Sequence, residues 1–452
     1  MVNAPVRYQL AGSTAAEISA SAERELRSGR LRAGDRLPPV RSLSGQLGVS
    51  PGTVAAAYKA LRLRGITVGD GRRGTRIAHQ PAVSSPTAAE SFAVRSIPAG
   101  VRDLASGNPD PSLLPDIRPY LRDVSRAPLG EVTRLYGEPP YLPELVDMAR
   151  AQFAADGVPA DAVAVVGGAL DGVERALQAQ LRPGDQVIVE DPGYPGVLDL
   201  VAALGLSVLP VAIDAEGVLP AAFERAAAGG ARAAVITPRA QNPTGAALTD
   251  ARARQLRAVL REYPGILVIE DDHAGVISGA AAVTLAHRRR QRWAVIRSVS
   301  KVLGPDLRLA ALSGDEATVA LVEGRRQLGA GWVSRILQRL VVGLWSDPSV
   351  SSLMIRAALE YSARREAFVR ALAAAGVSVE APSGLNVWVP VHEEQAAVAR
   401  LLAEGWLVAA GERFRRRTRP AVRVTVSCLA PAEAPVVASL LAAAYRPGPR
   451  LG

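Results

Sequence analysis

Lys301 is the residue whose type and position most clearly suggest chemistry in this chain. The chain has 53 basic residues, but only Lys59 and Lys301 are lysines. Lys301 ends the segment Ser298-Val-Ser-Lys301, which follows the apolar stretch 293–296. Arginine stays protonated, whereas a partly buried lysine can lose its proton and form an imine with an aldehyde. A compositional bias toward arginine can also leave a lysine by chance, so residue type alone keeps both interpretations open.

Polar or glycine-rich segments follow five predicted strands. Beyond residue 100, apolar runs alternate with Ala- and Leu-rich helical stretches, which indicates an α/β fold with a mainly parallel sheet. Open parallel sheets bind ligands at the carboxyl ends of their strands. The predicted strands are 162–166, 186–190, 233–237, 266–270 and 294–299. The segments after them are Gly167-Gly168-Ala169, Asp191-Pro-Gly-Tyr194-Pro, Asn242-Pro-Thr-Gly245, Asp271-Asp272-His273 and the lysine segment.

The first 78 residues have the pattern of a small helical module with a hairpin. Apolar spacing predicts helices over 13–28 and 40–47, and Ser50 caps a third helix that starts at Pro51. Gly48 follows the second helix, where a left-handed residue can end it. Strands 66–68 and 75–77 flank a turn with two arginines. The pattern favours a helix-turn-helix with a basic wing, and a generic three-helix bundle is the alternative.

Charge is concentrated in the same module. Residues 1–79 hold thirteen basic residues against five acidic ones, a net charge of +8, so the other 373 residues carry only +2. This asymmetry indicates a polyanion-binding module attached to a nearly neutral body. The Pro-, Ser- and Ala-rich stretch 80–100 is predicted to be a linker. Two further basic runs, 287–292 and 413–419, are interpreted as solvated loops, with an auxiliary DNA track as the alternative.

The bulk composition argues against several other classes of protein. One cysteine and four scattered histidines predict neither a disulfide framework nor a metal site. The chain has no charged-then-apolar leader and no apolar run of bilayer length. We therefore expect a soluble cytoplasmic protein.

The N-terminal motifs resemble a known regulator family. Leu37-Pro-Pro-Val-Arg41, Leu47-Gly-Val-Ser50-Pro-Gly-Thr53 and Gly71-Arg-Arg-Gly-Thr75 are similar to the winged helix-turn-helix of GntR-type transcription regulators. In this family the position of Arg41 and the start of the recognition helix touch DNA. Pro51 stands where many members carry an arginine, which removes one expected contact. The predicted DNA-binding residues are Arg41, Ser50, Gly52, Thr53, Lys59, Arg62, Arg72 and Arg73.

Residues 101–445 resemble fold-type I pyridoxal-phosphate enzymes of the class I aminotransferase family. With the N-terminal module, this matches the MocR-type branch of GntR regulators, in which the aminotransferase-like domain is a sensor. The implied domains are a winged helix-turn-helix at 8–78, a linker at 79–100, a large cofactor-binding domain at 101–345 and a small α+β domain at 346–446. A homodimer is also implied.

The resemblance assigns a role to each residue at the predicted sheet edge. Lys301 and Asp271 are the catalytic pair, with Lys301 as the imine-forming amine and Asp271 facing the pyridine nitrogen. Arg423 would clamp a substrate or effector carboxylate; otherwise it is an ordinary edge-strand charge. Stacking on the ring is assigned to Tyr194, bonding to the phenolic oxygen to Asn242, and a phosphate contact across the dimer to Tyr136. The other phosphate donors are Gly168, Ala169, Ser298 and Arg308.

One departure from the family pattern bears on function. His273 stands where the family usually has a tyrosine that bonds the phenolic oxygen, which makes transamination slow or absent. Asn242, by contrast, is the residue found in working aminotransferases. Our main hypothesis is a regulator that binds operator DNA and senses pyridoxal phosphate or a carboxylate-bearing amino compound through an external aldimine. The alternative is a cytoplasmic pyridoxal-phosphate-dependent aminotransferase with an accessory DNA-binding module.

Overall fold

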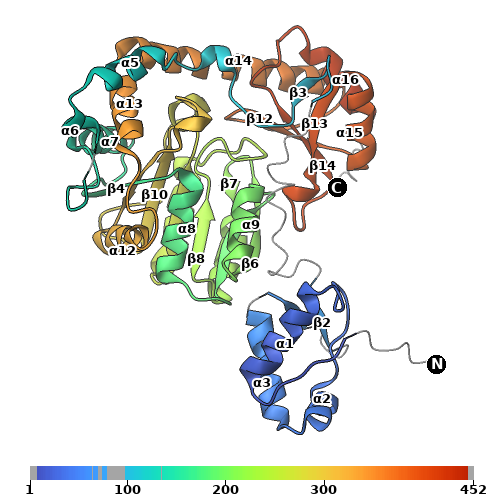
Figure 1. Cartoon of the computed structure of the whole chain (residues 1–452). Helices are drawn as coiled ribbons and strands as arrows, with labels where there is room; N and C mark the ends of the chain where they lie inside the picture. The colour runs from blue at the N-terminus through green and yellow to red at the C-terminus, as the bar shows by residue number, and fades with distance from the viewer. Residues whose placement is uncertain (1–7, 64, 70–73, 79–96, 134, 446–452) are drawn as a thin grey trace. The chain divides into compact units, whose positions relative to one another are not determined.

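The computed structural model describes residues 8–63, 65–69, 74–78, 97–133 and 135–445. These residues divide into two compact units, which are described separately. The first comprises the described residues up to Ala78 and the short stretches Leu181–Val187 and Leu198–Val208, and the second comprises the remainder. Most of the predicted linker lies outside the described residues. Figure 1 shows the elements of both units.

The N-terminal unit has three helices and a hairpin, as its apolar spacing predicts. The elements are α1 (Ala15–Arg27), α2 (Val40–Leu47), α3 (Pro51–Leu63), β1 (Thr67–Gly69) and β2 (Thr75–Ile77), with the two strands antiparallel. Thr14 and Glu17 form a capping box that starts α1. Gly48 ends α2 in the left-handed conformation, with φ 65°. Ile18, Val54, Leu61 and Ile77 are among the buried side chains that join the helices to the hairpin.

A sheet of eight strands forms the body of the large domain. The strand order is β4-β11-β10-β9-β8-β5-β6-β7. Strands β8, β9 and β10 are parallel, while β11 is antiparallel to both β10 and β4. The strands are β4 (Ala162–Val166), β5 (Gln186–Asp191), β6 (Ser207–Asp214), β7 (Gly217–Val218), β8 (Ala233–Ile236), β9 (Leu267–Asp272), β10 (Trp293–Ser298) and β11 (Ala310–Gly314).

Helices cover the large sheet and account for its two-sided burial. In Figure 1, α8 and α9 lie in front of the sheet. Strands β4 and β8 through β11 are buried along nearly their whole length, as expected of strands covered on both faces. The helices of this part of the chain, not all of which touch the sheet, are α5 (Arg118–Arg126), α6 (Leu129–Val132), α7 (Pro143–Ala155), α8 (Ala169–Gln180), α9 (Pro195–Ala203), α10 (Pro220–Ala228), α11 (Asp250–Glu262), α12 (Glu316–Gln327) and α13 (Arg335–Ser346).

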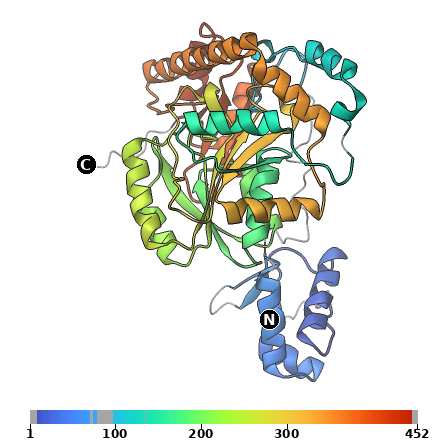
Figure 2. The same cartoon turned by 90° about the vertical axis from the view of Figure 1, so that its left-hand side faces the viewer.

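A smaller α+β domain follows the long helix α14 (Pro348–Ala374). Its sheet has the order β12-β14-β13-β3, so the early strand β3 (Arg102–Leu104) pairs with late elements of the chain. The other elements are β12 (Asn386–Pro390), β13 (Trp406–Ala410), β14 (Ala421–Thr425), α15 (Glu394–Ala403) and α16 (Ala434–Ala442). Both views show α14 running along one side of the molecule (Figures 1 and 2). Val350 packs in the core beside α13, and Phe368 and Leu372 pack in the core of the small domain, so one helix joins the two cores.

Two sequence interpretations need correction in detail. Asp271 and Asp272 lie inside β9 rather than after it. The basic run 287–292 is not a solvated loop throughout, because Arg290 is only 9% exposed and donates hydrogen bonds to the carbonyls of Leu260 and Ile266. Its side chain satisfies backbone oxygens that would otherwise be buried without donors.

Candidate functional site

The strand order brings the predicted chemical segments to one sheet edge. Strands β9 and β10 pair in parallel with Asp271 opposite Ile296, so the aspartate lies beside the strand that leads to Lys301. Helix α8 opens at Ala169 immediately after β4, and Tyr194 follows β5. Parallel strands place their carboxyl ends on a common side, and these residues therefore converge although they are distant in sequence.

Lys301 sits in a partly buried position that favours loss of its proton. Burial, followed by the positive charge of Arg423, lowers the pKa of Lys301 to about 8. Its Nζ donates a hydrogen bond to the carbonyl oxygen of Gly107, 2.6 Å away. A larger fraction of this amine is neutral at physiological pH than for an exposed lysine, as a nucleophilic amine requires.

Asp271 is a buried carboxyl group with an unused acceptor. The residue is 5% exposed, and its Oδ1 has no hydrogen-bond partner among the described residues. Burial first, and the neighbouring acids Asp272 and Glu190 second, raise the pKa of Asp271 to about 7. A buried acceptor without a donor is costly, so the position fits a bound cationic donor such as a protonated ring nitrogen.

Arg423 contributes a buried positive charge beside Lys301. It is 5% exposed on β14, between β12 and β13, so the edge-strand interpretation of this residue is wrong. Its guanidinium donates to Asn242 Oδ1 over 3.2 Å and to the carbonyl of Ala105, and it stacks 4.9 Å from the Phe414 ring centroid. Its Nε has no partner among the described residues. Burial lowers the pKa of Arg423 to about 10, so it remains a cation at neutral pH.

The predicted phosphate donors lie at the start of α8 and after β10. Gly168 has φ 108°, and a Cβ added there would lie 2.9 Å from a terminal guanidinium nitrogen of Arg308. The close approach explains why a glycine is needed and shows that Arg308 faces the α8 start. Ser298 is 5% exposed and its hydroxyl lies 3.0 Å from that of Ser300. Backbone amides at a helix start, a hydroxyl and a guanidinium together form a suitable anion site.

The two predicted tyrosines are placed differently. Tyr194 is 36% exposed and close enough to Arg423 to interact electrostatically with it. Tyr136 is 92% exposed, and its ring packs edge-on against Trp332 with 5.5 Å between centroids. Among the described contacts, none joins Tyr136 to the Lys301 cluster within one chain.

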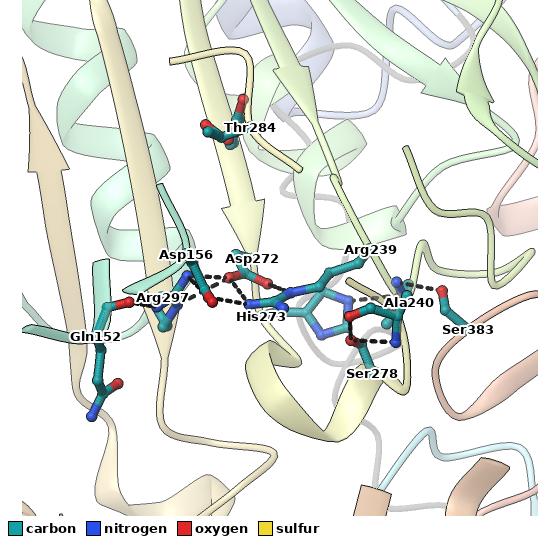
Figure 3. Close-up of polar contacts among 12 residues, drawn as sticks. Gln152, Asp156, Arg239, Ala240, Asp272, His273, Ser278, Thr284, Arg297 and Ser383 are labelled. Atoms are coloured by element: carbon teal, nitrogen blue, oxygen red, sulfur yellow. Dashed lines mark hydrogen bonds and ion pairs between the residues drawn. The ribbon is translucent and has the colours of Figure 1, made fainter. Parts of the chain in front are cut away.

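Sequence reasoning missed a buried ion network directly beside the site, shown in Figure 3. Asp272 accepts hydrogen bonds from Arg239 and Arg297, and both arginines also pair with Asp156. His273, next in sequence, shares a 3.0 Å hydrogen bond between its Nε2 and the carbonyl of Ala240. Burial, followed by the charge of Lys301, lowers the pKa of His273 to about 4, so it is neutral at physiological pH. The one available signal was Arg297, a charged residue inside the apolar stretch that forms β10.

The predicted DNA-binding residues lie on the surface of the N-terminal unit. Arg41, Ser50, Gly52, Lys59 and Arg62 are exposed, and Thr53 is partly exposed. Ser50 also caps α3, because its Oγ accepts a 3.1 Å hydrogen bond from the amide of Thr53. The wing arginines Arg72 and Arg73 lie outside the described residues.

Comparison with known proteins identifies the class of protein. Residues 14–77 match the gntR family of bacterial regulatory proteins, and residues 99–441 match the aminotransferase class I and II family. The chain belongs to the GntR-family transcription regulators that carry an aminotransferase domain, the MocR-type branch. The domain is of the pyridoxal-phosphate-binding kind, and Lys301, the unpaired Asp271 oxygen and the Gly168–Arg308 approach fit that cofactor.

The relatives extend over nearly the whole chain. The vitamin B6 salvage pathway transcriptional repressor PtsJ of Salmonella typhimurium is 42% identical, over 92% of this chain and 95% of that protein. The regulator TauR of Rhodobacter capsulatus is 30% identical, over 93% and 94%. The fold is similar to that of Pyrococcus horikoshii kynurenine aminotransferase, with a TM-score of 0.70 at 20% identity, over 77% of this chain and 91% of that chain.

Two structural features bear on the other predictions. Among the described residues, no helix is both long and apolar enough to cross a membrane. Within the same residues, no group of three or more histidine, cysteine or acidic side chains is arranged to hold a metal ion.

Proposed function

We propose that this regulator couples occupancy of the Lys301 site to affinity for operator DNA. The observation that carries the proposal is the convergence of a depressed-pKa amine, a buried unpaired carboxyl oxygen and a buried arginine at one sheet edge. A ligand that this site held more tightly in one domain arrangement than in another would shift the balance between the arrangements and so alter DNA affinity.

The cofactor would be held by this chain's own residues in the following way. Pyridoxal phosphate supplies an aldehyde that an amine can capture and a ring that withdraws electrons when its nitrogen is protonated. Lys301 would hold the aldehyde carbon and Asp271 the ring nitrogen, with the ring stacked on Tyr194. Asn242 and His273 would face the phenolic oxygen. The phosphate would be bound by Gly168, Ala169, Ser298 and Arg308.

The effector is proposed to be a B6 vitamer or a carboxylate-bearing amino compound. The names of two relatives support the first, because PtsJ is a vitamin B6 salvage repressor and PdxR of Corynebacterium glutamicum, 31% identical over 57% of this chain, is a pyridoxine biosynthesis regulator. Arg423 supports the second, since a guanidinium can bind a carboxylate through two parallel hydrogen bonds. Its buried, unpartnered Nε offers a donor for such a ligand.

A homodimer with a shared site is part of the proposal. Tyr136 and Leu328 are 92% and 80% exposed, which is unusual for large apolar or aromatic residues and favours burial against a second copy. Tyr136 would then reach the phosphate of the partner's site. Cytoplasmic localisation is proposed from the DNA-binding role.

The alternative function is an aminotransferase with an accessory DNA-binding module. Asn242, the residue found in working aminotransferases, favours this alternative. His273 disfavours it, because a neutral imidazole bonded to the carbonyl of Ala240 stands where those enzymes have a tyrosine hydroxyl that bonds the phenolic oxygen. Purified protein that turns over amino donors rapidly and ignores promoter fragments would establish this alternative.

The two lysines of the chain provide a sharp test. Incubation with pyridoxal phosphate should give visible absorbance that Lys301→Ala removes and Lys59→Ala retains. In gel-shift assays on the promoter of a neighbouring gene, Lys59→Ala should weaken binding while Lys301→Ala should abolish the response to effector. Borohydride reduction and mass spectrometry should place the adduct on Lys301. A colourless wild type, or colour that persists in Lys301→Ala, would refute the proposed site.

A further inference from the structure

A cavity of about 430 Å³ lies outside the Lys301 site, between β6, α10 and the loop 415–419. This volume falls within the range of small-molecule sites, about 300–1,000 Å³. One wall is apolar and is formed by residues of β6 and α10: Leu209, Pro210, Val211, Ala212, Ala222 and Ala226. The remaining wall is polar and contains Arg225, Arg417, Thr418 and Asp191.

The two arginines give this cavity an unbalanced positive charge. Neither Arg225 nor Arg417 has a side-chain partner among the described residues, and both are exposed. The Asp191 carboxylate in the wall offsets only one of the two positive charges, so one positive charge remains. Its oxygens accept the backbone amides of residues 416, 417 and 418 at 2.7, 2.8 and 3.2 Å, and among the described residues no ion pair joins it to either arginine. Two free guanidinium groups beside an apolar wall match an anionic head group on an apolar body.

The polar wall is also connected to the Lys301 site. Thr418 donates to the carbonyl of Asp191 over 3.0 Å, and the amide of Gly193 donates to the carbonyl of Phe414 over 2.7 Å. These bonds fasten the loop to Asp191 at the end of β5 and to Gly193, which directly precedes Tyr194. Phe414 in turn lies against the guanidinium of Arg423. A ligand that held Arg417 would therefore act on a loop whose other end supports Arg423.

We infer that this cavity is a second ligand site, which binds a small organic anion with an apolar body through Arg225 and Arg417. The site is separate from the proposed cofactor site and does not depend on it. Carboxylate and phosphate head groups share the chemistry that the arginines recognise, and the experiment below distinguishes them.

The test uses the full-length protein and the fluorescent anion 8-anilino-1-naphthalenesulfonate. Loading with pyridoxal phosphate followed by borohydride reduction blocks the Lys301 site, so that the probe reports the cavity. The reduced protein should bind the probe saturably, at one site per chain from which a competing small organic anion displaces it. Arg225→Gln and Arg417→Gln should each weaken this binding about tenfold or more, because each removes one charge-assisted interaction. Arg419→Gln is the matched control, since it removes a charge from the same loop outside the cavity. Ala212→Trp should block binding by filling the exposed side of the cavity.

Competition identifies the head group and separates this inference from the proposed function. Displacement by phenylacetate but not phenyl phosphate would assign a carboxylate ligand, and the reverse would assign a phosphate ligand. Unchanged probe affinity in both arginine variants, or loss of the displaceable site on borohydride reduction, would overturn the inference. Neither result would affect the colour test on Lys301. If the protein proved colourless, the same probe titration on untreated protein and on the arginine variants would still test the cavity.

Discussion

Replacing Asp272 with asparagine should destabilise the large domain by about 3 kcal/mol or more. Asp272 is 3% exposed and receives two hydrogen bonds from Arg239, each 2.8 Å long, and one of 3.0 Å from Arg297. A second nitrogen of Arg297 forms an ion pair with Asp272 at 2.9 Å. Asparagine keeps one acceptor but turns an amide donor toward guanidinium donors, and it leaves two buried cations with less compensation. Breaking a buried ion pair on one side costs about 3–5 kcal/mol. Asp156 still pairs with both arginines, which places the expected loss at the lower end.

Urea unfolding followed by tryptophan fluorescence measures this loss directly. All five tryptophans lie between residues 293 and 406, so the signal reports the large and small domains without the N-terminal unit. The control is Asp161→Asn, whose pair with Arg288 has side chains 55% and 72% exposed and should contribute less than about 1 kcal/mol. If Asp272→Asn were no less stable than Asp161→Asn, the buried ion network around Asp272 would not stabilise the large domain.

The pH dependence of the same variant provides an internal check. Burial alone would raise the pKa of Asp272, but hydrogen bonds and charges from Arg239 and Arg297 hold it below the ordinary pKa of an aspartate. A group whose pKa is lower in the folded than in the unfolded state stabilises the fold at pH values above its unfolded-state pKa. This stabilisation is lost as the pH falls toward the folded-state pKa. The stability gap between wild type and Asp272→Asn should therefore be full at pH 6 and shrink below about pH 4. A gap that stayed constant into acid would contradict the ionised state of Asp272.

Three further outcomes are expected. Burial raises the pKa of Glu270 to about 7, so its folded state holds a proton that the unfolded state releases, and stability should fall from pH 5 to pH 8; Glu270→Gln should reduce this fall in urea titrations, and an undiminished slope would assign it to other groups. Gly48→Ala should lower the free energy of unfolding of the N-terminal unit by about 1 kcal/mol, as measured by thermal unfolding followed by circular dichroism. The cost comes from the left-handed backbone, with φ 65°, and not from a clash, because no atom lies within 4 Å of the added Cβ. A neutral effect would argue against the left-handed end of α2. Arg41→Gln should weaken DNA binding evenly across sequences and lower the slope of log affinity against log salt by about 1, as measured by fluorescence anisotropy. A sequence-selective loss would instead assign Arg41 to a base contact.

Local patterns were sufficient for the elements whose physics is local. The spacing of Ile18, Val54 and Leu61 predicted helices that the structure contains, and Gly48 ends α2 as expected. The predicted strand 162–166 is β4, and the other four predicted strands differ from β5, β8, β9 and β10 by one or two residues at their ends. Periodicity and turn residues act within a few positions, so they can be recognised without knowledge of the fold.

Elements that depend on distant partners were not predicted. Strand β11 inserts antiparallel between β4 and β10, which are separated by more than a hundred residues, and its sequence does not indicate that position. Arg423 was read as a possible edge charge because a strand sequence does not say which strands will flank it. The same limit hid Arg239, which follows β8 and whose partner Asp272 lies on β9.

The sequence by itself determined the class of protein and the order of the segments that carry chemistry. It also placed one lysine, Lys59, in the N-terminal module and the other, Lys301, in the aminotransferase-like domain. These follow from residue type and short-range spacing, which survive without coordinates. Only the tertiary structure decided the electrostatic state of the site: the depressed pKa of Lys301, the unpaired oxygen of Asp271 and the burial of Arg423. Those properties arise from desolvation and from charges brought together by the sheet, and both depend on neighbours that are far apart along the chain.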